Sequence, residues 1–393
     1  MIFDDVYRGK TVLVTGHTGF KGSWMSEWLS LLRANVVGYS LKPDPAIDVC
    51  YTTPYSHFNE LALRDQITAH VEGDVRRLDE LVATVSKHRP DFIFHFAAQP
   101  LVLRAYEEPH LTVETNVSGT LNLLEAVRRQ ESPCIMIMIT TDKVYENVGW
   151  LYSYREPDML GGHDTYSASK ACAELVISSY WRSFFAPKLG ELGIAVVPVR
   201  GGNVIGGGDW AKDRIVPDAM KALSENRKVK IRNRHATRPW QHVLELLSGY
   251  LHLGALIHRR RDALFNARSN KKSGALAKLQ ALCSPFNFGP FLTSNKSVGV
   301  LVEEIFKNWP GEALDSTTPS APEEAGKLNL TIDKAYHTLG WQPKWGFEEA
   351  IQHTVDWYRE FYAQGHRRPE AVRELTQKQI RAYAEGLTYF VNE

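Results

Sequence analysis

The sequence lacks the features that mark secreted, membrane-spanning and metal-binding proteins. Its 393 residues include only four cysteines, which are far apart and form no Cys-x-x-Cys pair: Cys50, Cys134, Cys172 and Cys283. This spacing argues against a disulfide framework and against a zinc site, so we expect no metal. The first residues, MIFDDVYRGK, carry two acids where a signal peptide would be basic, and no apolar run is long enough to span a membrane. The sequence therefore predicts a cytoplasmic protein.

An excess of charge of either sign is also lacking. Lys and Arg number 46 and Asp and Glu number 45, which gives a formal net charge of +1. No run of like charge extends beyond Arg259–Arg261, so the field expected of a nucleic-acid or anionic-membrane binder is absent. We expect a small-molecule partner, no nucleic acid and no membrane.

Short apolar runs alternate with helix-like segments over the first half of the chain. The runs TVLVTG, NVVGYS, DFIFHFAAQ and CIMIMITT are nearly continuous in apolar residues, which is typical of parallel strands covered by helices on both faces. The sequence thus predicts an α/β fold with a doubly wound parallel sheet of the Rossmann type. Because the chain exceeds the usual size of one core, we also expect a smaller mixed α/β lobe that binds substrate.

The pattern becomes less regular after residue 201, which sets the expected domain boundaries. The predicted Rossmann domain covers residues 1–200, and about 238–268 return to it. The substrate lobe covers 201–237 and about 269–370, and residues 371–393 form a helical C-terminal tail. We interpret the basic stretch HRRRDALFNARSNKKSGALAKL as a solvated excursion, with a binding patch as the alternative.

Three glycines, Gly16, Gly19 and Gly22, lie between an apolar strand and a helix in TVLVTGHTGFKGSW. Glycines at such a junction let backbone N–H groups approach a pyrophosphate, which the positive end of the helix dipole also favours. A glycine-rich turn without a ligand is the alternative, but this motif has both the strand before it and the helix after it. It therefore predicts a dinucleotide site.

The segment YSASK places Tyr166 and Lys170 four residues apart, on one face of a helix. A neighbouring ammonium stabilises a phenolate, so the pair could act as a base on an alcohol at neutral pH. A solvated helix edge is the alternative.

Asp142 and Lys143 follow directly on the apolar run CIMIMITT. An acid and an amine at that place could supply a general acid and a general base for the loss of water next to a newly formed ketone. A structural ion pair that closes the strand is one alternative, and a proton shared within the pair is another.

Together these motifs resemble the extended branch of the short-chain dehydrogenase/reductase superfamily. GDV at Gly73–Val75, FAAQ at Phe96–Gln99 and a Thr, Tyr, Lys catalytic set formed by Thr141, Tyr166 and Lys170 carry the resemblance. It implies NAD as a tightly bound cofactor that is regenerated in each cycle. The implied cofactor contacts are Gly16, Thr18, Gly19, Phe20, Lys21, Gly22, Asp74, Val75, Ala97, Ala98, Gln99, Asn116, Tyr166 and Lys170.

The segment GYSLKPD departs from the usual pattern of NAD-binding proteins. It offers Ser40 and Lys42 before any carboxylate, whereas an acid that binds the ribose 2′-hydroxyl is the usual mark of NAD. The choice of NAD over NADP therefore rests on the resemblance.

TTDK resembles the Thr-Asp-Glu motif of the nucleotide-sugar 4,6-dehydratases, with Lys143 in place of the Glu. Lys at that position is the mark of the branch that acts on CDP-D-glucose. The segments GGNVIGGGDWAKDRIVPD, IRNRHATRPWQHVLE and LGWQPKW are similar to that branch as well, so the resemblance covers nearly the whole chain.

The resemblance implies a redox-neutral conversion of CDP-D-glucose to CDP-4-dehydro-6-deoxy-D-glucose, which feeds deoxysugar and O-antigen biosynthesis. Tyr166 would take the 4-hydroxyl proton while NAD takes the C4 hydride, and Thr141 would bond to the same hydroxyl. Asp142 would then protonate the leaving 6-hydroxyl, Lys143 would handle the C5 proton, and hydride would return to C6.

Contacts to the phosphates of the sugar nucleotide are implied for Asn203, Arg214 and Arg238, the two arginines acting as cationic donors. Surface arginines without a ligand are the alternative. The resemblance further implies a homo-oligomer, a dimer or a tetramer, in which YSASKACAELVISSYWRSFF pairs with the helix near Asn116–Arg129. An additional core contact within one chain is the alternative to that pairing.

Other functions remain open on the same residues. A nucleotide-sugar 4-epimerase would use the same Tyr and Lys without an acid and base on the strand. A 4,6-dehydratase for another nucleotide-glucose and a non-catalytic NAD-sensing regulator are further alternatives.

Overall fold

A parallel sheet forms the centre of the computed structural model, which describes residues 2–43, 55–316, 328–363 and 368–387. Seven strands lie in the order β11-β6-β5-β4-β1-β2-β3, and every neighbouring pair is parallel. The strands are β1 (Thr11–Thr15), β2 (Asn35–Ser40), β3 (Ala69–Glu72), β4 (Phe92–His95), β5 (Ile135–Ile139), β6 (Ala195–Gly201) and β11 (Phe286–Phe288). The predicted doubly wound parallel sheet is confirmed.

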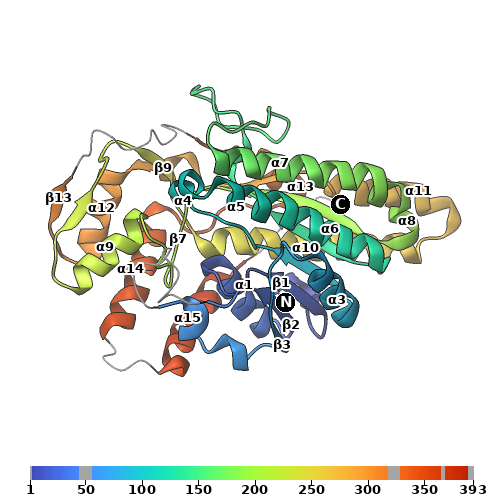
Figure 1. Ribbon diagram of the computed structural model, residues 1–393, viewed down its shortest axis with the longest axis horizontal. Helices are drawn as coiled ribbons and strands as arrows, with labels where there is room; N and C mark the ends of the chain where they lie inside the picture. Colours follow the sequence, from blue (N-terminus) through green and yellow to red (C-terminus); the bar gives the residue numbers. More distant parts are fainter. Residues whose placement is uncertain (1, 44–54, 317–327, 364–367, 388–393) are drawn as a thin grey trace.

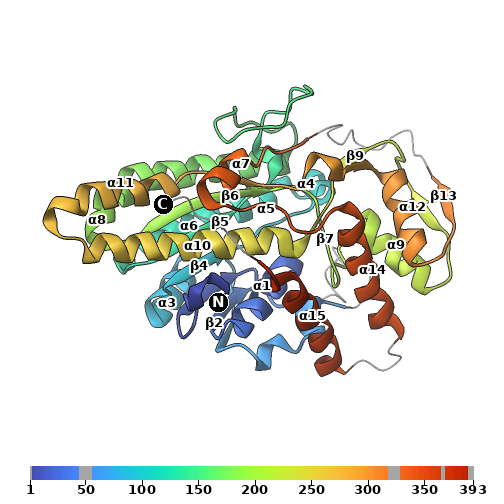
Figure 2. The same cartoon turned by 180° about the vertical axis from the view of Figure 1, so that it is seen from behind.

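Two layers of helices cover the sheet, as Figures 1 and 2 show from opposite sides. One layer contains α1 (Phe20–Leu31) and α10 (Val243–Asn266); the other contains α3 (Leu78–His88), α6 (Gly119–Gln130) and α7 (Thr165–Tyr180). Shorter helices are α2 (His57–Glu60), α4 (Val102–Glu107), α5 (Pro109–Val113), α8 (Leu189–Leu192) and α13 (Asp333–Leu339). The layers explain why the strands read as continuous apolar runs, because both faces are buried.

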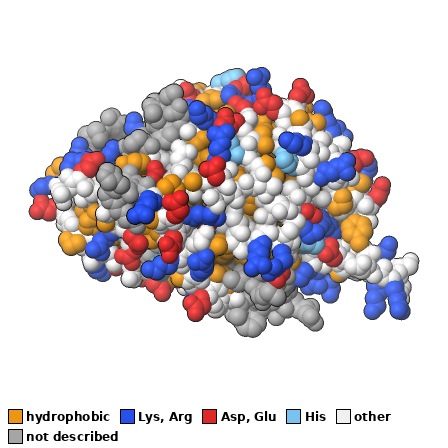
Figure 3. Space-filling view, turned by 90° about the horizontal axis from the view of Figure 1, so that it is seen from below, with side chains coloured by type: hydrophobic (Ala, Val, Ile, Leu, Met, Phe, Trp, Pro, Cys, Tyr) orange, Lys and Arg blue, Asp and Glu red, His pale blue; other side chains and the backbone are white. Residues whose placement is uncertain are grey.

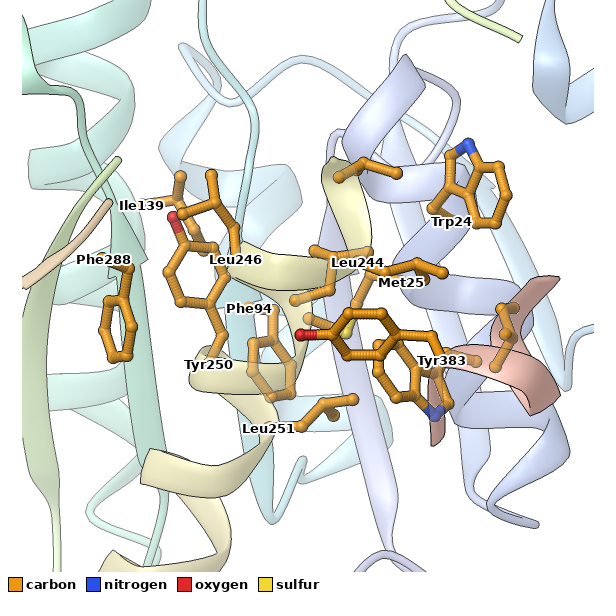
Figure 4. Packing of buried hydrophobic residues seen from close by; sticks show 14 of the residues in the cluster. Trp24, Met25, Phe94, Ile139, Leu244, Leu246, Tyr250, Leu251, Phe288 and Tyr383 are labelled. Atoms are coloured by element: carbon orange, nitrogen blue, oxygen red, sulfur yellow. The ribbon is translucent and has the colours of Figure 1, made fainter. Parts of the chain in front are cut away.

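Strand β5 shows this alternation most clearly. Ile135, Ile137 and Ile139 belong to the core cluster on the α1 and α10 side, whereas Met136 and Met138 belong to the cluster on the α3, α6 and α7 side. Figure 4 shows the first of these clusters, where side chains from α10 such as Leu244 and Leu251 meet those from the strands and α1. A polar residue within such a strand needs a hydrogen-bond partner in the core, and in β5 all five residues are apolar, so its polar groups follow the end of the strand.

The smaller lobe lies to one side of the sheet, at the left of Figure 1. It contains α9 (Ile215–Ser224), α12 (Val298–Asn308) and α14 (Phe347–Ala363). Two short strand pairs accompany them: β8 (Val229–Ile231) with β13 (Ala313–Asp315), parallel, and β9 (Thr237–Pro239) with β12 (Asn295–Ser297), antiparallel. A third pair, β7 (Val204–Ile205) with β10 (Gln241–His242), leads back to α10.

The segment after residue 269 differs from expectation in two respects. Strand β11 pairs with β6 in the main sheet instead of lying in the lobe, and α11 (Lys272–Leu282) packs against α10. The basic stretch expected to be a solvated excursion is largely helical, because Leu264 and Leu279 occur at positions that bury against the core. Between residues 262 and 278 every side chain except Leu264 is exposed or partly exposed, so the stretch is a solvated excursion that is helical.

The C-terminal tail contains α15 (Pro369–Ala384), which packs against α1, α2 and α14. Cys50 and residues 388–393 lie outside the described ranges. The exact domain boundaries stay a prediction.

The helices and the surface charge of the described residues can be compared with the expectations from composition. None of the helices there is both long and apolar enough to cross a membrane. Acidic and basic side chains are interspersed over the face seen in Figure 3, in keeping with a formal net charge of +1.

Candidate active site

The predicted site residues gather at the carboxyl edge of the sheet. Strands β1 and β4 are neighbours there, although β2 and β3 lie between them in the sequence and to one side of them in the sheet. In open α/β sheets ligands bind outside the carboxyl ends of the strands at the point where the strand order reverses. The turns that follow β1, β4 and β5 all reach this edge.

The turn after β1 is drawn tightly against its neighbours. Gly16 has φ +72°, and a Cβ at this position would lie 2.7 Å from the backbone N of Ala97 in the turn after β4. A Cβ at Gly22, on α1, would lie 2.1 Å from the Gly16 carbonyl oxygen. Both positions therefore require glycine, and the close approach leaves the start of α1 open to a ligand as a phosphate cradle would need. Thr18 Oγ1 lies 2.8 Å from Ser40 Oγ at the end of β2.

A cavity of about 520 Å³ opens beyond the ends of β2 and β3. Its volume is in the range of small-molecule sites. The lining residues are Leu41, Lys42, Glu72, Gly73, Asp74, Arg76, Arg77, Glu80 and Glu114. Asp74 was expected to contact the cofactor, and Val75 next to it is buried. This cavity could hold the adenosine half of a dinucleotide whose pyrophosphate lies in the cradle.

The arginines in this cavity are already paired with carboxylates. Arg76 Nη2 lies 2.6 Å from Asp74 Oδ2, and its Nη1 lies 3.4 Å from Glu114 Oε2. Arg77 Nε lies 3.6 Å from Glu80 Oε1. Burial acts to raise the pKa of Asp74, but the hydrogen bonds from Arg76 outweigh it, so that pKa is lowered.

Thr141, Asp142 and Tyr166 come together just past the end of β5. Thr141 Oγ1 donates a hydrogen bond to Asp142 Oδ1 at 3.0 Å, and a side-chain hydrogen bond joins Thr141 to Tyr166. Tyr166 lies in the first turn of α7, which Asp164 caps by accepting the backbone N–H of Ser167 at 3.0 Å. The cap fixes the start of α7 and with it the position of the phenol.

Asp142 is buried, with 3% of its surface exposed, and burial raises the pKa of its carboxyl above the ordinary value. The charges of Lys143, Lys21 and Arg238 and the hydrogen bond from Thr141 oppose this shift without cancelling it. Within the described ranges Asp142 and Lys143 form no ion pair, and Lys143 is half-buried. A raised pKa makes this carboxyl a better proton donor near neutral pH than an ordinary Asp, whereas a direct ion pair with Lys143 would lower its pKa.

Lys170 contacts the end of β5. Its ammonium donates a hydrogen bond to the Ile139 carbonyl oxygen at 3.1 Å, at the end of β5. Burial raises the pKa of Tyr166 to about 12, and the groups that act to lower it are Thr141, through its hydrogen bond, and Arg214, through its charge. The ammonium thus holds the end of β5 with one of its three N–H donors, and its role in stabilising the phenolate stays a prediction.

Two lysines in the site have lowered pKa values. Burial lowers the pKa of Lys170 to about 8, helped by the charge of Lys21 and opposed by Glu174. Burial also lowers the pKa of Lys21 to about 8, helped by Arg214 and opposed by Asp142 and Asp209. Lys21, expected only as a cofactor contact, therefore also lies within electrostatic reach of the catalytic residues.

The three expected phosphate contacts face the same region from the lobe side. Arg214 Nη1 lies 3.0 Å from Asp209 Oδ2, and Arg238 acts on Asp142 through its charge. Asn203 is half-buried beside Gly202, where a Cβ would lie 3.2 Å from Asp142 Oδ2. Arg238 acts on Asp142 and Arg214 on Tyr166 through their charges, so this side of the site is suited to an anionic group.

Asn116 supports the turn after β4. Its Oδ1 accepts the backbone N–H of Gln99 at 2.8 Å, and its Nδ2 donates to Ser169 Oγ on α7 at 2.8 Å. A single π-helical turn, Glu114–Ser118, places it there. Such turns often occur at functional sites. The cofactor contacts expected for Asn116, Gln99, Ala98 and Phe20 stay predictions.

Three residues near the site were missed in the sequence. Asp209 holds Arg214, and Glu174 forms a buried ion pair with Arg200. Glu174 stands four residues after Lys170 and so shares its helix face, which was an available signal. Arg200 lies near the end of an apolar strand, a position similar to that of Lys143, and this was a second available signal. By contrast, nothing in the segment GGGDW indicates which residue Asp209 contacts.

The larger of the two best-defined cavities lies away from these residues. It has a volume of about 860 Å³ and is lined by 150–158, 290–293 and 330–333 in part. None of the expected site residues lines it. In the part of the chain that the structure describes, no group of three His, Cys, Asp or Glu side chains is placed to hold a metal ion.

Comparison with known proteins gives consistent matches over nearly the whole chain. Residues 13–354 match the family model described as GDP-mannose 4,6 dehydratase. CDP-glucose 4,6-dehydratase of Salmonella typhimurium is 41% identical over 91% of this chain and 93% of that protein. CDP-paratose 2-epimerase of Salmonella typhi is 32% identical over 73% of this chain and 83% of that protein.

A solved structure shares the fold. The crystal structure of dTDP-glucose 4,6-dehydratase from Bacillus anthracis in complex with NAD matches with a TM-score of 0.67 and 21% identity, over 90% of this chain and 98% of that one. With the family model matched over residues 13–354, the chain belongs to the GDP-mannose 4,6-dehydratase family.

Proposed function

We propose that this protein is a CDP-glucose 4,6-dehydratase, which converts CDP-D-glucose to CDP-4-dehydro-6-deoxy-D-glucose with NAD that is regenerated in each cycle. The observation that carries the proposal is the buried Asp142, whose pKa burial raises, beside Thr141 and Tyr166. The relative that is 41% identical over 91% of this chain is a CDP-glucose 4,6-dehydratase.

Tyr166 and Thr141 would act on the 4-hydroxyl of the sugar. The bound cofactor would supply a reversible hydride acceptor at C4 and donor at C6. Tyr166 would take the hydroxyl proton as a phenolate. Burial disfavours the phenolate because it raises the pKa of Tyr166, whereas the hydrogen bond from Thr141 and the charge of Arg214 lower that pKa. The substrate hydroxyl would add a further hydrogen bond in a site that excludes water, where such bonds are strengthened.

Asp142 and Lys143 would carry out the elimination of water across C5 and C6. A carboxyl whose pKa is raised by burial keeps a proton to give to the leaving 6-hydroxyl. Lys143 would remove the C5 proton, which the adjacent ketone acidifies. A 4-epimerase would have no use for an acid here, so the burial and the raised pKa of Asp142 favour the dehydratase over that alternative.

Arg214 and Arg238 would bind the pyrophosphate of the sugar nucleotide, with Asn203 beside them. Arg214 is held by Asp209 at 3.0 Å, which fixes its position before substrate arrives. Arginine suits this role because its planar fork matches phosphate oxygens.

The charge of the adenosine cavity supports NAD over NADP. Its lining includes four carboxylates, Glu72, Asp74, Glu80 and Glu114, against three cations, Lys42, Arg76 and Arg77. Arg76 and Arg77 already contact carboxylates. A 2′-phosphate would therefore enter a cavity with a negative balance, despite Lys42.

A homo-oligomer is proposed from apolar side chains on one helical layer. Leu121 on α6 is 36% exposed, Leu175 on α7 is 58% exposed, and Phe184 just after α7 is 42% exposed. Large apolar groups gathered on one layer are typical of a subunit interface. We further propose a cytoplasmic location and a place in deoxysugar and O-antigen biosynthesis; Cys134, Cys172 and Cys283 are free thiols.

The oligomer can be tested by sedimentation equilibrium. The wild type should have at least twice the mass of the 44.5 kDa chain, and Leu175→Glu should dissociate because it buries a charge in the interface. Leu151→Glu changes an equally apolar side chain that is 82% exposed in another region and should leave the mass unchanged. A monomeric wild type would contradict the proposal.

Cofactor preference can be measured by calorimetric titration with NAD and NADP. NAD should bind at least about tenfold more tightly, a difference of roughly 1.4 kcal/mol. Glu72→Gln removes one carboxylate of the cavity and should reduce the difference in affinity between NAD and NADP. Glu107→Gln lies outside the lining and should leave that difference unchanged. Tighter binding of NADP would overturn the cofactor assignment and point to Lys42.

The substrate can be identified by incubating the protein and NAD with CDP-, dTDP-, UDP- and GDP-glucose in parallel. We expect CDP-glucose to lose water to a 4-keto sugar with kcat/KM at least about tenfold above the others. Conversion to a galactose nucleotide without loss of water would identify an epimerase instead. Absence of any reaction with all four would refute the proposed activity.

The roles of the acid and the phenol can be separated in a single turnover. Asp142→Asn keeps the shape but cannot donate a proton, so reduced cofactor should accumulate on the enzyme while kcat falls by about 10²–10⁴-fold. Tyr166→Phe is the matched control, because it should block the first oxidation and form no reduced cofactor. Lys143→Met should suppress exchange of the C5 hydrogen in heavy water. Wild-type turnover in both Asp142→Asn and Lys143→Met would leave the pair without a catalytic role.

A further inference from the structure

A buried ion pair lies directly behind the catalytic residues. Arg200, at the end of β6, donates from Nη2 to Glu174 Oε2 at 2.5 Å and from Nε to Glu174 Oε1 at 2.9 Å. Each side chain is only 2% exposed. Neither residue reaches the open part of the site, so neither is expected to contact the substrate.

Glu174 connects α7 to the end of β5. Its Oε1 accepts a hydrogen bond from Thr140 Oγ1 at 2.6 Å, and one turn earlier on the same helix Lys170 donates to the Ile139 carbonyl oxygen at 3.1 Å. Two successive inner positions of α7 therefore hold two successive residues of the strand end. The helix that carries Tyr166 is thereby fixed against the residue that precedes Thr141.

Arg200 connects the same pair to the other end of the catalytic segment. Its Nη1 donates to Tyr145 Oη at 2.6 Å, and its guanidinium lies 4.7 Å from the centre of the Tyr145 ring. Tyr145 Oη in turn donates to Asn287 Oδ1 on β11 at 2.8 Å. Asp142 and Lys143 thus lie between two residues, Thr140 and Tyr145, that the ion pair holds from opposite sides.

The energetics of such a pair argue against a purely stabilising role. Removing two charges from water is costly, and replacing a buried pair by apolar side chains of similar size is often neutral or even stabilising. What the pair provides is fixed geometry, since the bidentate contact and the bonds to Thr140 and Tyr145 allow little freedom of position.

The charge of Glu174 also acts on Lys170. The other charged or titratable groups that act on this ammonium are Lys21 on α1, which lowers its pKa, and His95 at the end of β4, whose own pKa burial lowers to about 3. Glu174 is the only one of the three with a negative charge to offer, and it opposes the loss of the Lys170 proton.

We propose that Arg200 and Glu174 are positioning residues that hold the segment Thr141–Lys143 in register with Tyr166 and Lys170 and that keep Lys170 charged. The proposal rests on the proposed function for the part that concerns turnover. The part that concerns Lys170 does not depend on any substrate.

Turnover is tested with the apolar double variant Glu174→Leu/Arg200→Met, which removes both charges and keeps the volume. It should remain folded, with kcat for CDP-glucose roughly 10–100-fold below wild type and KM within about threefold, because small displacements of catalytic groups cost rate more than binding. The control Lys228→Met/Glu312→Leu removes an ion pair whose two side chains are both exposed, beside the paired strands β8 and β13, and should leave both constants unchanged. A folded Glu174→Leu/Arg200→Met variant with wild-type kcat would overturn the positioning role.

If the double variant does not fold, the positioning role is tested with Tyr145→Phe. This change removes only the hydroxyl that accepts the hydrogen bond from Arg200. A fall in kcat of about threefold or more supports the proposal, and an unchanged kcat contradicts it.

The charge of Lys170 is tested without substrate by NMR titration of the protein labelled at lysine Cε, with Lys170→Met to identify the signal. In Glu174→Gln the Lys170 signal should titrate at lower pH than in wild type, since the one negative group beside it is lost. If the midpoint of the Lys170 titration is the same in Glu174→Gln and in wild type, Glu174 does not keep Lys170 charged. If the wild type fails to convert CDP-glucose, the proposed function fails, while this titration still decides whether Glu174 keeps Lys170 charged.

Discussion

Burial of the parallel sheet on both faces is the constraint on which the rest of the molecule depends. Strand β5 sends its isoleucines into one core cluster and its methionines into the other, so none of its side chains is available for chemistry along its length. Chemistry is therefore confined to the carboxyl edge, where the chain leaves the sheet. Thr140, Thr141, Asp142 and Lys143 are the first residues past that point.

The same burial makes the edge a region of low polarity in which charges are crowded. Burial raises the pKa of Asp142 and lowers those of Lys21 and Lys170, so each of these groups is moved toward its neutral form. Opposite charges nearby act against these shifts. Acid and base catalysis near neutral pH needs groups whose pKa values lie near 7, and burial and neighbouring charges together set those values. Arg200 and Glu174, by contrast, neutralise each other through direct contact.

The lobe contributes Arg214 through a glycine-rich loop that α1 of the main domain and α14 of the lobe hold in place. Trp24 on α1 donates from Nε1 to the Gly207 carbonyl oxygen at 2.8 Å, and a Cβ at Gly207 would lie 2.0 Å from Trp357 on α14. The glycine-rich loop can pass between α1 and α14 only without a side chain there. Asp209 follows in this loop and holds Arg214 toward Tyr166. The sheet thus supplies the cradle and the lobe supplies the cationic side of the site.

The sequence by itself determined the parallel sheet, the place of the cradle and the sharing of one helix face by Tyr166 and Lys170, because these follow from local periodicity and spacing. It also determined that Asp142 and Lys143 stand at a strand end. Only the tertiary structure decided which side chains around the site contact one another. Examples are the bond from Lys170 to Ile139, the pairing of Asp209 with Arg214, and the contact of Glu174 with Arg200. It likewise brought β11 into the main sheet and folded the basic stretch into helices. Such partners come from different strands and helices, and their meeting depends on how the layers pack, which no local pattern encodes.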